Sequence, residues 1–405
     1  MKAVICGAGI AGLALAQRLD ALGWEVVVLE KAPGPRPQGY MIDFFGPGYD
    51  AAEAMELLPR LQELAYPVQE AASVDHHGRT RARLTYEQFG RAVRGRLLSL
   101  MRPDLEQALR ESLSGRVDLR FATTIRHLDN QPTGVHLALT NGSTLAADLL
   151  VGADGIHSTV RSLAHGDEER YVRYLGFHTA AFVFDDPEVH SQVRDRFCLT
   201  DTLGRQMGFY GLRDGKVAAF AVHRTPDPAL PADARRALLR EYAGLGWVVP
   251  RALERCPPAD CVYYDRVAQI ELPQWSSGRV TLVGDACQAV SLLAGQGASL
   301  GIAGAYVLAE QLHRGPSIEA AMESYERIWR PVIADKQRTA RKAARWFIPG
   351  AAWQLHVRRG ILKAAGLPGV NRYVGVALAG KPTSVVTELQ GAARPEPGRP
   401  ESPQL

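Results

Sequence analysis

Three glycines near the N-terminus, Gly7, Gly9 and Gly12, have the GxGxxG spacing that holds the pyrophosphate of a dinucleotide. They stand between a short apolar run and an expected helix over 10–22. The start of that helix would turn unpaired N–H groups and the positive end of its dipole toward the phosphates. Glu30 ends the next apolar run, where a carboxylate can accept hydrogen bonds from the adenosine ribose. The pattern predicts a dinucleotide site without a 2′-phosphate and leaves NAD and FAD open.

Two further groups of residues suited to this chemistry lie far downstream. Segment 151–161 contains Asp154 and Gly155 directly after an apolar run. Segment 279–285 is another apolar run, and it ends in Asp285. A carboxylate at the end of a strand can accept hydrogen bonds from sugar hydroxyls.

The three groups together resemble the motifs of the p-hydroxybenzoate-hydroxylase-like, or class A, FAD-dependent monooxygenases. That family includes aromatic and polyketide hydroxylases and tetracycline-inactivating monooxygenases. The motifs stand in the family's order, and the resemblance extends over roughly residues 1–345. It implies FAD as the cofactor and NAD(P)H as the electron donor. It also implies that O₂ reacts through a C4a-hydroperoxyflavin to oxygenate an aromatic or polyketide-like small molecule.

The FAD-binding residues expected from the motifs and the resemblance come from distant parts of the chain. They are Gly7, Gly9, Ile10, Ala11, Gly12, Glu30, Lys31, Arg36, Gly39, Arg102, Asp154, Gly155, Gly284, Asp285, Gly295, Gly297 and Ala298. The resemblance assigns Asp285 to the ribityl chain and Arg102 to a flavin contact. It places Gly295 and Gly297 beside the flavin N1–C2=O edge, where amides at a helix start would stabilise the reduced ring. A surface salt bridge is the alternative for Arg102, and capping of a turn is the alternative for Asp154.

The chain departs from the family pattern shortly after the third motif. Cys287 and Gln288 replace a common Ala-His pair. Ser291 stands where the family has a proline near the flavin C4a edge, and Ser299 where it often has asparagine. These differences concern the oxygen chemistry rather than FAD binding.

Other function classes on the same scaffold stay open. They are an FAD-dependent dehydrogenase or reductase, and a flavin-binding protein without turnover. A separate nicotinamide domain is disfavoured because no second GxGxxG joins a strand to a helix. The catalytic residues are unknown from sequence, with Arg205, Gln206 and Tyr210 as candidates on one expected strand. Gln206 and Tyr210 share one face of that strand and Arg205 lies on the other.

The composition narrows the class of protein. The 405 residues carry 47 Lys plus Arg against 43 Asp plus Glu, and this net charge of +4 disfavours a nucleic-acid partner. A hydrophobic share of 46% with 22% charged residues predicts a globular chain. Five scattered cysteines without CxxC spacing predict neither a disulfide framework nor a metal site. With no secretory or membrane-spanning segment, we expect a cytoplasmic monomer or homodimer that acts on a small molecule.

These motifs require an α/β fold that brings them together. Parallel βαβ patterns at both ends, with short β-like runs between 171 and 224, predict a Rossmann-type (GR2-like) FAD-binding domain. An antiparallel β-sheet substrate domain is inserted in it, and C-terminal helices follow. The expected divisions are 1–70, 96–170 and 266–345 for the discontinuous FAD domain, 71–95 and 171–265 for the β-sheet domain, 346–390 for the helical segment and 391–405 for a disordered tail.

Overall fold

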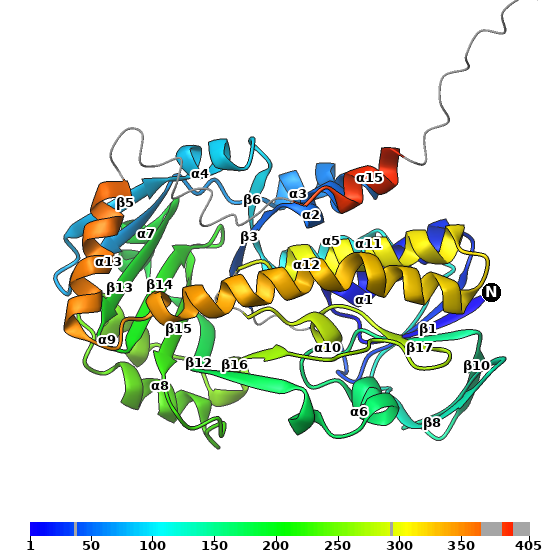
Figure 1. The fold of residues 1–405 in the computed structure, drawn as a ribbon. Coiled ribbons are helices and arrows are strands. Elements are labelled where there is room, and N and C mark those ends of the chain that lie inside the picture. Colours follow the sequence, from blue (N-terminus) through cyan, green and yellow to red (C-terminus); the bar gives the residue numbers. More distant parts are fainter. Residues whose placement is uncertain (36–38, 292–294, 366–382, 392–405) are drawn as a thin grey trace, which may run out of the picture.

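The computed structural model describes residues 1–35, 39–291, 295–365 and 383–391 (Figure 1). Its first layer is a five-stranded sheet in the order β17-β11-β1-β2-β7, in which every neighbouring pair is parallel. The strands are β1 (Lys2–Cys6), β2 (Glu25–Leu29), β7 (Asp118–Arg120), β11 (Leu149–Gly152) and β17 (Val280–Leu282). The central strands are apolar on both faces because helices cover the sheet. The predicted Rossmann-type fold is confirmed.

Three helices pack beside this sheet, and the last of them continues beyond it (Figure 1). α1 (Ile10–Ala21) packs against α11 (Gly297–Arg314), and α12 (Ile318–Phe347) packs against α11 in turn. The helix expected over 10–22 and the helix start expected near Gly297 are thus present. α12 has 30 residues and runs from the parallel sheet to the second sheet (Figure 1), where its Ala344 packs beside Phe177.

The second sheet has seven strands in the order β16-β12-β15-β14-β13-β4-β5. The strands are β4 (Glu70–Val74), β5 (Thr80–Thr85), β12 (Val172–Asp185), β13 (Arg196–Thr202), β14 (Arg205–Gly211), β15 (Lys216–Arg224) and β16 (Tyr263–Ile270). All pairs are antiparallel except β4 with β13. One face, called the back face here, packs on α7 (Pro187–Val193), α8 (Ala234–Tyr242) and α9 (Val249–Glu254). The opposite, front face turns toward the rest of the molecule.

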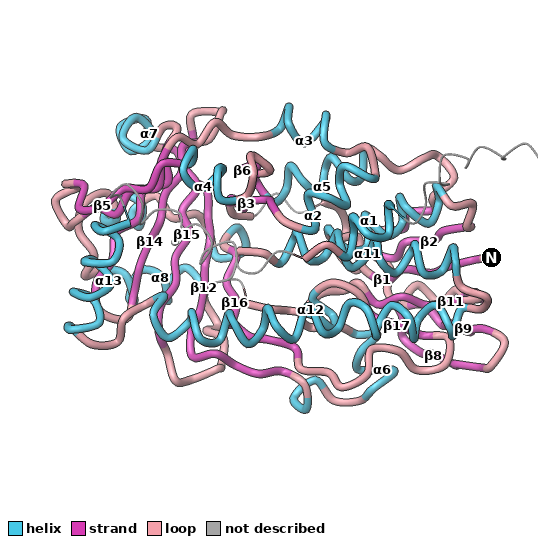
Figure 2. The backbone as a smooth tube through the Cα atoms, turned by 45° about the horizontal axis from the view of Figure 1, so that its top comes forward, coloured by secondary structure: helices cyan, strands magenta, loops and turns pink. Residues whose placement is uncertain are grey.

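A two-stranded ribbon of β3 (Met41–Phe45) and β6 (Leu97–Met101) lies between the two sheets (Figures 1 and 2). Its Met41 packs on the front face beside Tyr210. A third sheet joins β8 (Ile125–Gln131), β9 (Gly134–Leu139) and β10 (Thr144–Ala147), and a turn that contains Asn141 and Gly142 connects the last two. The remaining elements are α2 (Pro47–Ala54), α3 (Leu58–Leu64), α4 (Tyr86–Ala92), α5 (Arg102–Glu111), α6 (Thr159–His165), α10 (Asp285–Gln288), α13 (Ala352–Ala365), α15 (Val385–Gly391) and the 3₁₀ turns η1 (Glu168–Arg170) and η2 (Ala259–Cys261).

The C-terminal helices pack in two different places. α13 contacts β5 at the edge of the seven-stranded sheet, whereas α15 contacts α2 and α11. Of the tail expected at 391–405, only residue 391 belongs to the described residues. β16 crosses the expected division between residues 265 and 266, so this one strand includes residues of both expected domains. Within the described ranges, no helix is long and apolar enough to cross a membrane.

Candidate active site

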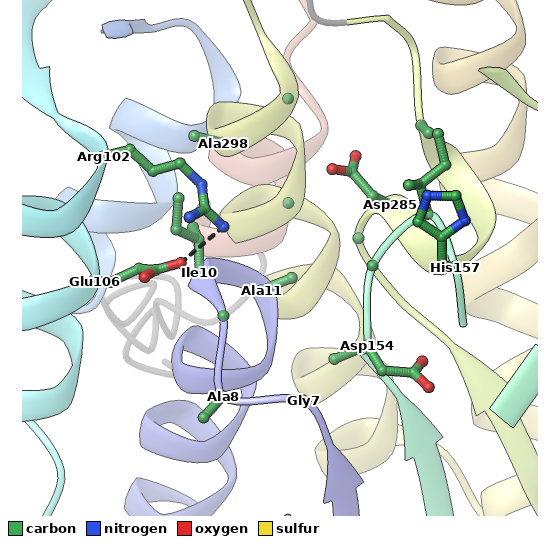
Figure 3. A pocket seen from close by; sticks show the side chains of 18 of the residues that line it. Gly7, Ala8, Ile10, Ala11, Arg102, Glu106, Asp154, His157, Asp285 and Ala298 are labelled. Atoms are coloured by element: carbon green, nitrogen blue, oxygen red, sulfur yellow. Dashed lines mark ion pairs between the residues drawn. The ribbon is translucent and has the colours of Figure 1, made fainter. Parts of the chain in front are cut away.

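A cavity of about 360 Å³ lies at the carboxyl ends of the parallel strands (Figure 3). Its wall includes the residues that directly follow β1, β2 and β11, and Gly284, two residues after β17. It also reaches the front face of the seven-stranded sheet, where Thr179 and Tyr263 line it. The carboxyl ends of the strands are where doubly wound sheets bind their ligands.

The three sequence motifs meet around this cavity. The predicted FAD-binding residues that line it are Gly7, Gly9, Ile10, Ala11, Glu30, Lys31, Arg102, Asp154, Gly155, Gly284, Asp285, Gly295, Gly297 and Ala298. Gly12 lies beneath the glycine loop rather than in the wall. Gly39 stands beside the start of α5, where a Cβ would lie 2.6 Å from Cδ of Pro103. Arg36 is outside the described residues.

The glycine loop is built to admit a ligand. A Cβ on Gly12 would lie 2.0 Å from the carbonyl oxygen of Gly7, so the tight turn itself requires this glycine. Gly9 differs, because the nearest atom to an added Cβ would be Oε1 of Glu106, at 3.8 Å. No contact with the described residues therefore requires glycine at position 9, and the space before it suits a pyrophosphate that approaches the backbone.

Glu30 connects the end of β2 to the glycine loop. Its carboxylate accepts hydrogen bonds from the backbone N–H groups of Ala8 at 2.9 Å and Ala32 at 2.8 Å. The side chain also lines the cavity, beside Lys31. This arrangement fixes one acidic group where the ribose of a dinucleotide would lie.

Asp285 begins α10 on the other side of the cavity and is exposed to it. The surrounding protein raises the pKa of this carboxyl by desolvation, while the positive charge of Arg102 lowers it. A Cβ on Gly297 would lie 4.0 Å from Oδ1 of Asp285, and none of the described residues comes within 4 Å of one on Gly295. The acceptor and the start of α11 thus border open space, as a ribityl chain and a flavin ring would require.

Arg102 begins α5 and turns its guanidinium into the cavity wall (Figure 3). It forms an ion pair with Glu106, one turn along the helix, at 2.8 Å between Nη2 and Oε1. Both side chains line the cavity. The salt bridge foreseen as an alternative for Arg102 is therefore present, but at the cavity rather than on the outer surface.

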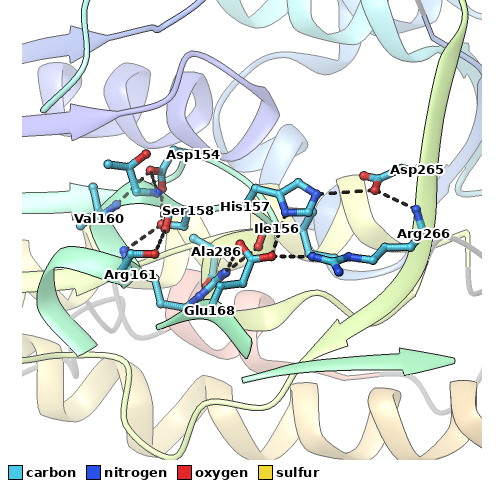
Figure 4. Close-up of polar contacts among 12 residues, drawn as sticks. Asp154, Ile156, His157, Ser158, Val160, Arg161, Glu168, Asp265, Arg266 and Ala286 are labelled. Atoms are coloured by element: carbon cyan, nitrogen blue, oxygen red, sulfur yellow. Dashed lines mark hydrogen bonds and ion pairs between the residues drawn. The ribbon is translucent and has the colours of Figure 1, made fainter. Parts of the chain in front are cut away.

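Asp154 uses its carboxylate to cap α6. It accepts hydrogen bonds from the backbone N–H groups of Thr159 at 2.7 Å and Val160 at 3.1 Å, and from the hydroxyl of Ser158 (Figure 4). Burial raises the pKa of Asp154, and these hydrogen bonds lower it. The turn-capping alternative thus accounts for the contacts of this residue at the cavity edge.

A charged cluster joins the loop before α6 to β16 (Figure 4). Nδ1 of His157 lies 2.9 Å from Oε1 of Glu168, and Nε2 lies 3.5 Å from Oδ1 of Asp265. Glu168 also pairs with Arg161 at 3.3 Å and Arg266 at 2.7 Å. The hydrogen bond with Asp265, followed by the one with Glu168, raises the pKa of His157. The cluster ties a cofactor-side loop to the edge strand of the second sheet.

The departures from the family pattern serve helix packing. Gln288 donates from Nε2 to the carbonyl of Leu300 at 2.9 Å and accepts from Nε1 of Trp329 at 2.8 Å. A Cβ on Gly304 would lie 2.7 Å from Nε1 of Trp329, so this glycine leaves room for the indole. Gln288 thereby joins α10, α11 and α12 and is absent from the cavity wall.

Ser299 connects α11 to α2. Its hydroxyl donates to the carbonyl of Phe45 at 2.5 Å and accepts from the N–H of Gly48 at 2.9 Å. Ser291 has a φ of 121°, which is strained for a residue other than glycine, and it lines the cavity.

Strand register decides which face of β14 looks toward the cavity. Gln206 pairs with Val222, which pairs with Thr179, and Thr179 lines the cavity. Gln206 and Tyr210 therefore lie on the front face. Arg205 lies on the back face beside His223, which corrects its candidacy for substrate contact. Neither Gln206 nor Tyr210 belongs to the cavity wall.

Sequence reasoning missed several residues that line the cavity, among them Tyr40, Glu106 and Tyr263. The i,i+4 spacing to Arg102 could have indicated Glu106. Alternation with Ile42 could have indicated Tyr40. No local signal points to Tyr263, because its position depends on the register of β16.

The matches with known proteins include the segments that contain these motifs. Residues 1–340 match a family described as FAD binding domain. An uncharacterized protein of Mycobacterium tuberculosis is 35% identical over 318 residues, which cover 76% of this chain and 84% of that protein. The flavin-dependent monooxygenase eupH of Phoma sp is 30% identical over 407 residues, which cover 93% of this chain and 94% of that protein.

Solved structures share the fold. The tetracycline destructase Tet(55) has a TM-score of 0.77 and 25% identity, with 90% of this chain and 96% of that chain covered. HpxO of Klebsiella pneumoniae, complexed with FAD and uric acid, has a TM-score of 0.76 and 21% identity, with 94% and 96% covered.

Proposed function

This chain belongs to the FAD-binding family of flavin-dependent monooxygenases, and from that premise we propose that it oxygenates an aromatic or polyketide-like small molecule with NAD(P)H and O₂. The observation that carries the proposal is the convergence of three distant motifs on one cavity that also reaches the front face of the second sheet. The similarity to a tetracycline destructase supports a substrate that contains rings.

The residues around the cavity fit FAD. Glu30 would accept hydrogen bonds from the adenosine ribose, and the N–H groups at the start of α1 would face the pyrophosphate. Asp285 would accept from the ribityl hydroxyls. Gly295 and Gly297, at the start of α11, would turn their amides and the helix dipole toward the flavin ring. When bound, FAD supplies the redox chemistry, which is reduction by the nicotinamide and activation of O₂ for transfer of one oxygen atom.

The protein's own contribution is position and electrostatics. The amides at the start of α11 stabilise negative charge near the ring, because their partial charges are already oriented. Arg102 adds one positive charge to the wall, and Glu106 offsets part of it. Thr179 and Tyr263 of the front face and Ile42 of β3 border the cavity on the side of the second sheet.

The test is to purify the protein, record its visible spectrum and measure NADH and NADPH oxidation across a panel of phenols and polyketides. We expect a flavin spectrum, substrate-stimulated oxidation of the nicotinamide, and a product that contains one atom from labelled O₂. A colourless protein that cannot be reconstituted with FAD would contradict the proposal. Flavin reduction without an oxygenated product would favour a dehydrogenase or reductase instead.

A matched pair of variants tests the cofactor assignment. Asp285→Ala should abolish flavin retention, because it removes the acceptor for the ribityl hydroxyls. Asp214→Ala changes an exposed carboxylate that pairs with Lys216 in a hairpin, and it should retain flavin as the unaltered protein does.

A further inference from the structure

Three aromatic side chains from separate segments meet where the cavity reaches the front face. Tyr263 of β16 and Phe220 of β15 both pair with Ala181 of β12. The two rings therefore stand on the same face, on either side of one small side chain. Tyr40, just before β3, contacts both, with ring centroids 5.7 Å from Phe220 and 5.9 Å from Tyr263. We call these three rings the aromatic wall.

The three rings of the aromatic wall are less buried than the rings of a hydrophobic core cluster. Phe209, on the back face, is fully buried. Tyr40, Phe220 and Tyr263 each remain partly exposed, although they lie between the two sheets. Tyr40 and Tyr263 also line the cavity. The exposed parts of Tyr40 and Tyr263 thus border space inside the protein, where a ring can lie against them.

The two phenol hydroxyls of the wall lack partners among the described residues. On the back face, by contrast, the hydroxyl of Tyr242 lies 3.0 Å from Nδ1 of His223. Burial raises the pKa of Tyr40 to about 12 and that of Tyr263 well above its usual value, so both hydroxyls stay protonated at neutral pH. Two neutral donors in a partly enclosed space favour a ligand that presents oxygen acceptors.

We propose that the aromatic wall selects the substrate, and that it takes a planar ring bearing a hydroxyl or carbonyl oxygen that the Tyr40 and Tyr263 hydroxyls can bind. The inference rests on the proposed function, which supplies the flavin on the other side of the ring. Offset and tilted ring contacts favour an aromatic ligand over a saturated one of equal size. The oxygen contact fixes the end of the ring that approaches the wall, and thereby the position that is presented for oxygenation.

The test uses the FAD-loaded enzyme and a matched pair of probes. 2-Naphthol is planar, whereas 2-decalol is its saturated analogue with the same hydroxyl. Each is titrated while the flavin absorbance spectrum is followed. We expect 2-naphthol to perturb the spectrum and to bind about tenfold more tightly than 2-decalol.

Substitutions separate the rings from the hydroxyls. Tyr40→Leu, Phe220→Leu and Tyr263→Leu should each weaken 2-naphthol binding by about tenfold. Tyr40→Phe and Tyr263→Phe keep the ring and should weaken it by about threefold to tenfold. Tyr66→Leu is the control, because that ring packs on Arg213 outside the wall, and it should leave binding unchanged. FAD affinity is measured in every variant by flavin fluorescence during reconstitution, so that a loss of cofactor is told apart from a loss of 2-naphthol binding.

Several outcomes would overturn the inference while the proposed function stands. They are equal binding of 2-decalol and 2-naphthol, no spectral response to 2-naphthol in a flavin-loaded enzyme, and leucine variants that bind 2-naphthol normally. Leucine variants that lose FAD affinity but keep 2-naphthol binding would assign the wall to the cofactor instead. A protein that never retains FAD would contradict both proposals.

Discussion

The carboxylate of Glu30 accepts a hydrogen bond from the backbone N–H of Ala8 at 2.9 Å, and so joins the end of β2 to the glycine loop after β1. The N–H of Ala32 donates to the other carboxylate oxygen at 2.8 Å. An ionised carboxylate has about four acceptor positions, so the same group can also accept from a ribose in the cavity. One side chain thereby holds the loop and stays available to a ribose in the cavity.

Glu30→Gln should weaken FAD binding by about tenfold to a hundredfold, because a hydrogen bond to a charged acceptor contributes about 1.5–3 kcal/mol. The amide also introduces a donor opposite the N–H groups of the loop. The measurement is a fluorescence titration of the apoprotein with FAD. Glu25→Gln, at the exposed start of the same strand, is the control and should bind FAD normally. Equal affinities for the two variants would show that Glu30 does not read the ribose.

Glu106→Gln should tighten FAD binding, because it removes a negative charge beside the space where the pyrophosphate would lie. The amide oxygen can still accept from Arg102, so the guanidinium keeps its place while its charge is no longer offset. We expect a threefold to tenfold lower Kd, on the order of 1 kcal/mol, at low ionic strength. The gain should shrink as salt is added.

The control for that change is Glu111→Gln, on the same helix, which removes an exposed carboxylate paired with Arg60. It should leave the Kd for FAD unchanged. Weaker binding by Glu106→Gln would mean that Arg102 depends on the full charge of Glu106 to hold its position.

The cofactor side of the site could be predicted from sequence because its determinants are local. Gly7, Gly9 and Gly12 indicate a turn that is set by neighbouring residues. The end of an apolar run indicated that Asp285 would lie at the cavity. The substrate side could not be predicted from sequence, because it depends on the pairing register of strands that lie far apart in the chain. Tyr263 and Phe220 face each other across Ala181 only once β16, β12 and β15 are aligned.

His157 should make stability depend on pH. Its pKa is raised in the folded protein, chiefly by the hydrogen bond with Asp265, above the ordinary value of 6.5. A raised pKa stabilises the fold fully below the unfolded value, and the contribution is lost as pH rises through the folded value. His157→Gln should therefore lower the free energy of unfolding most at about pH 5.5 and progressively less toward pH 8.5.

Denaturant unfolding of the unaltered protein and the variant across that range checks this prediction. His136→Gln, an exposed histidine on β9, serves as the control and should change the free energy of unfolding little. A difference that grew with pH for His157→Gln would have the wrong sign and would reject the pairing with Asp265 and Glu168.

Gln288→Ala tests whether the replacement of the family histidine is structural. The change leaves the indole N–H of Trp329 without its acceptor and opens a void between α10, α11 and α12. Gln288 is only 1% exposed, so water cannot readily replace the lost contacts, and we expect a loss of about 2–3 kcal/mol in the free energy of unfolding.

Gln131→Ala, on the exposed part of β8, is the control and should lower the free energy of unfolding little. The flavin spectrum should not change, because Gln288 lies outside the cavity wall. A variant of normal stability with a shifted flavin spectrum would instead place this side chain beside the ring.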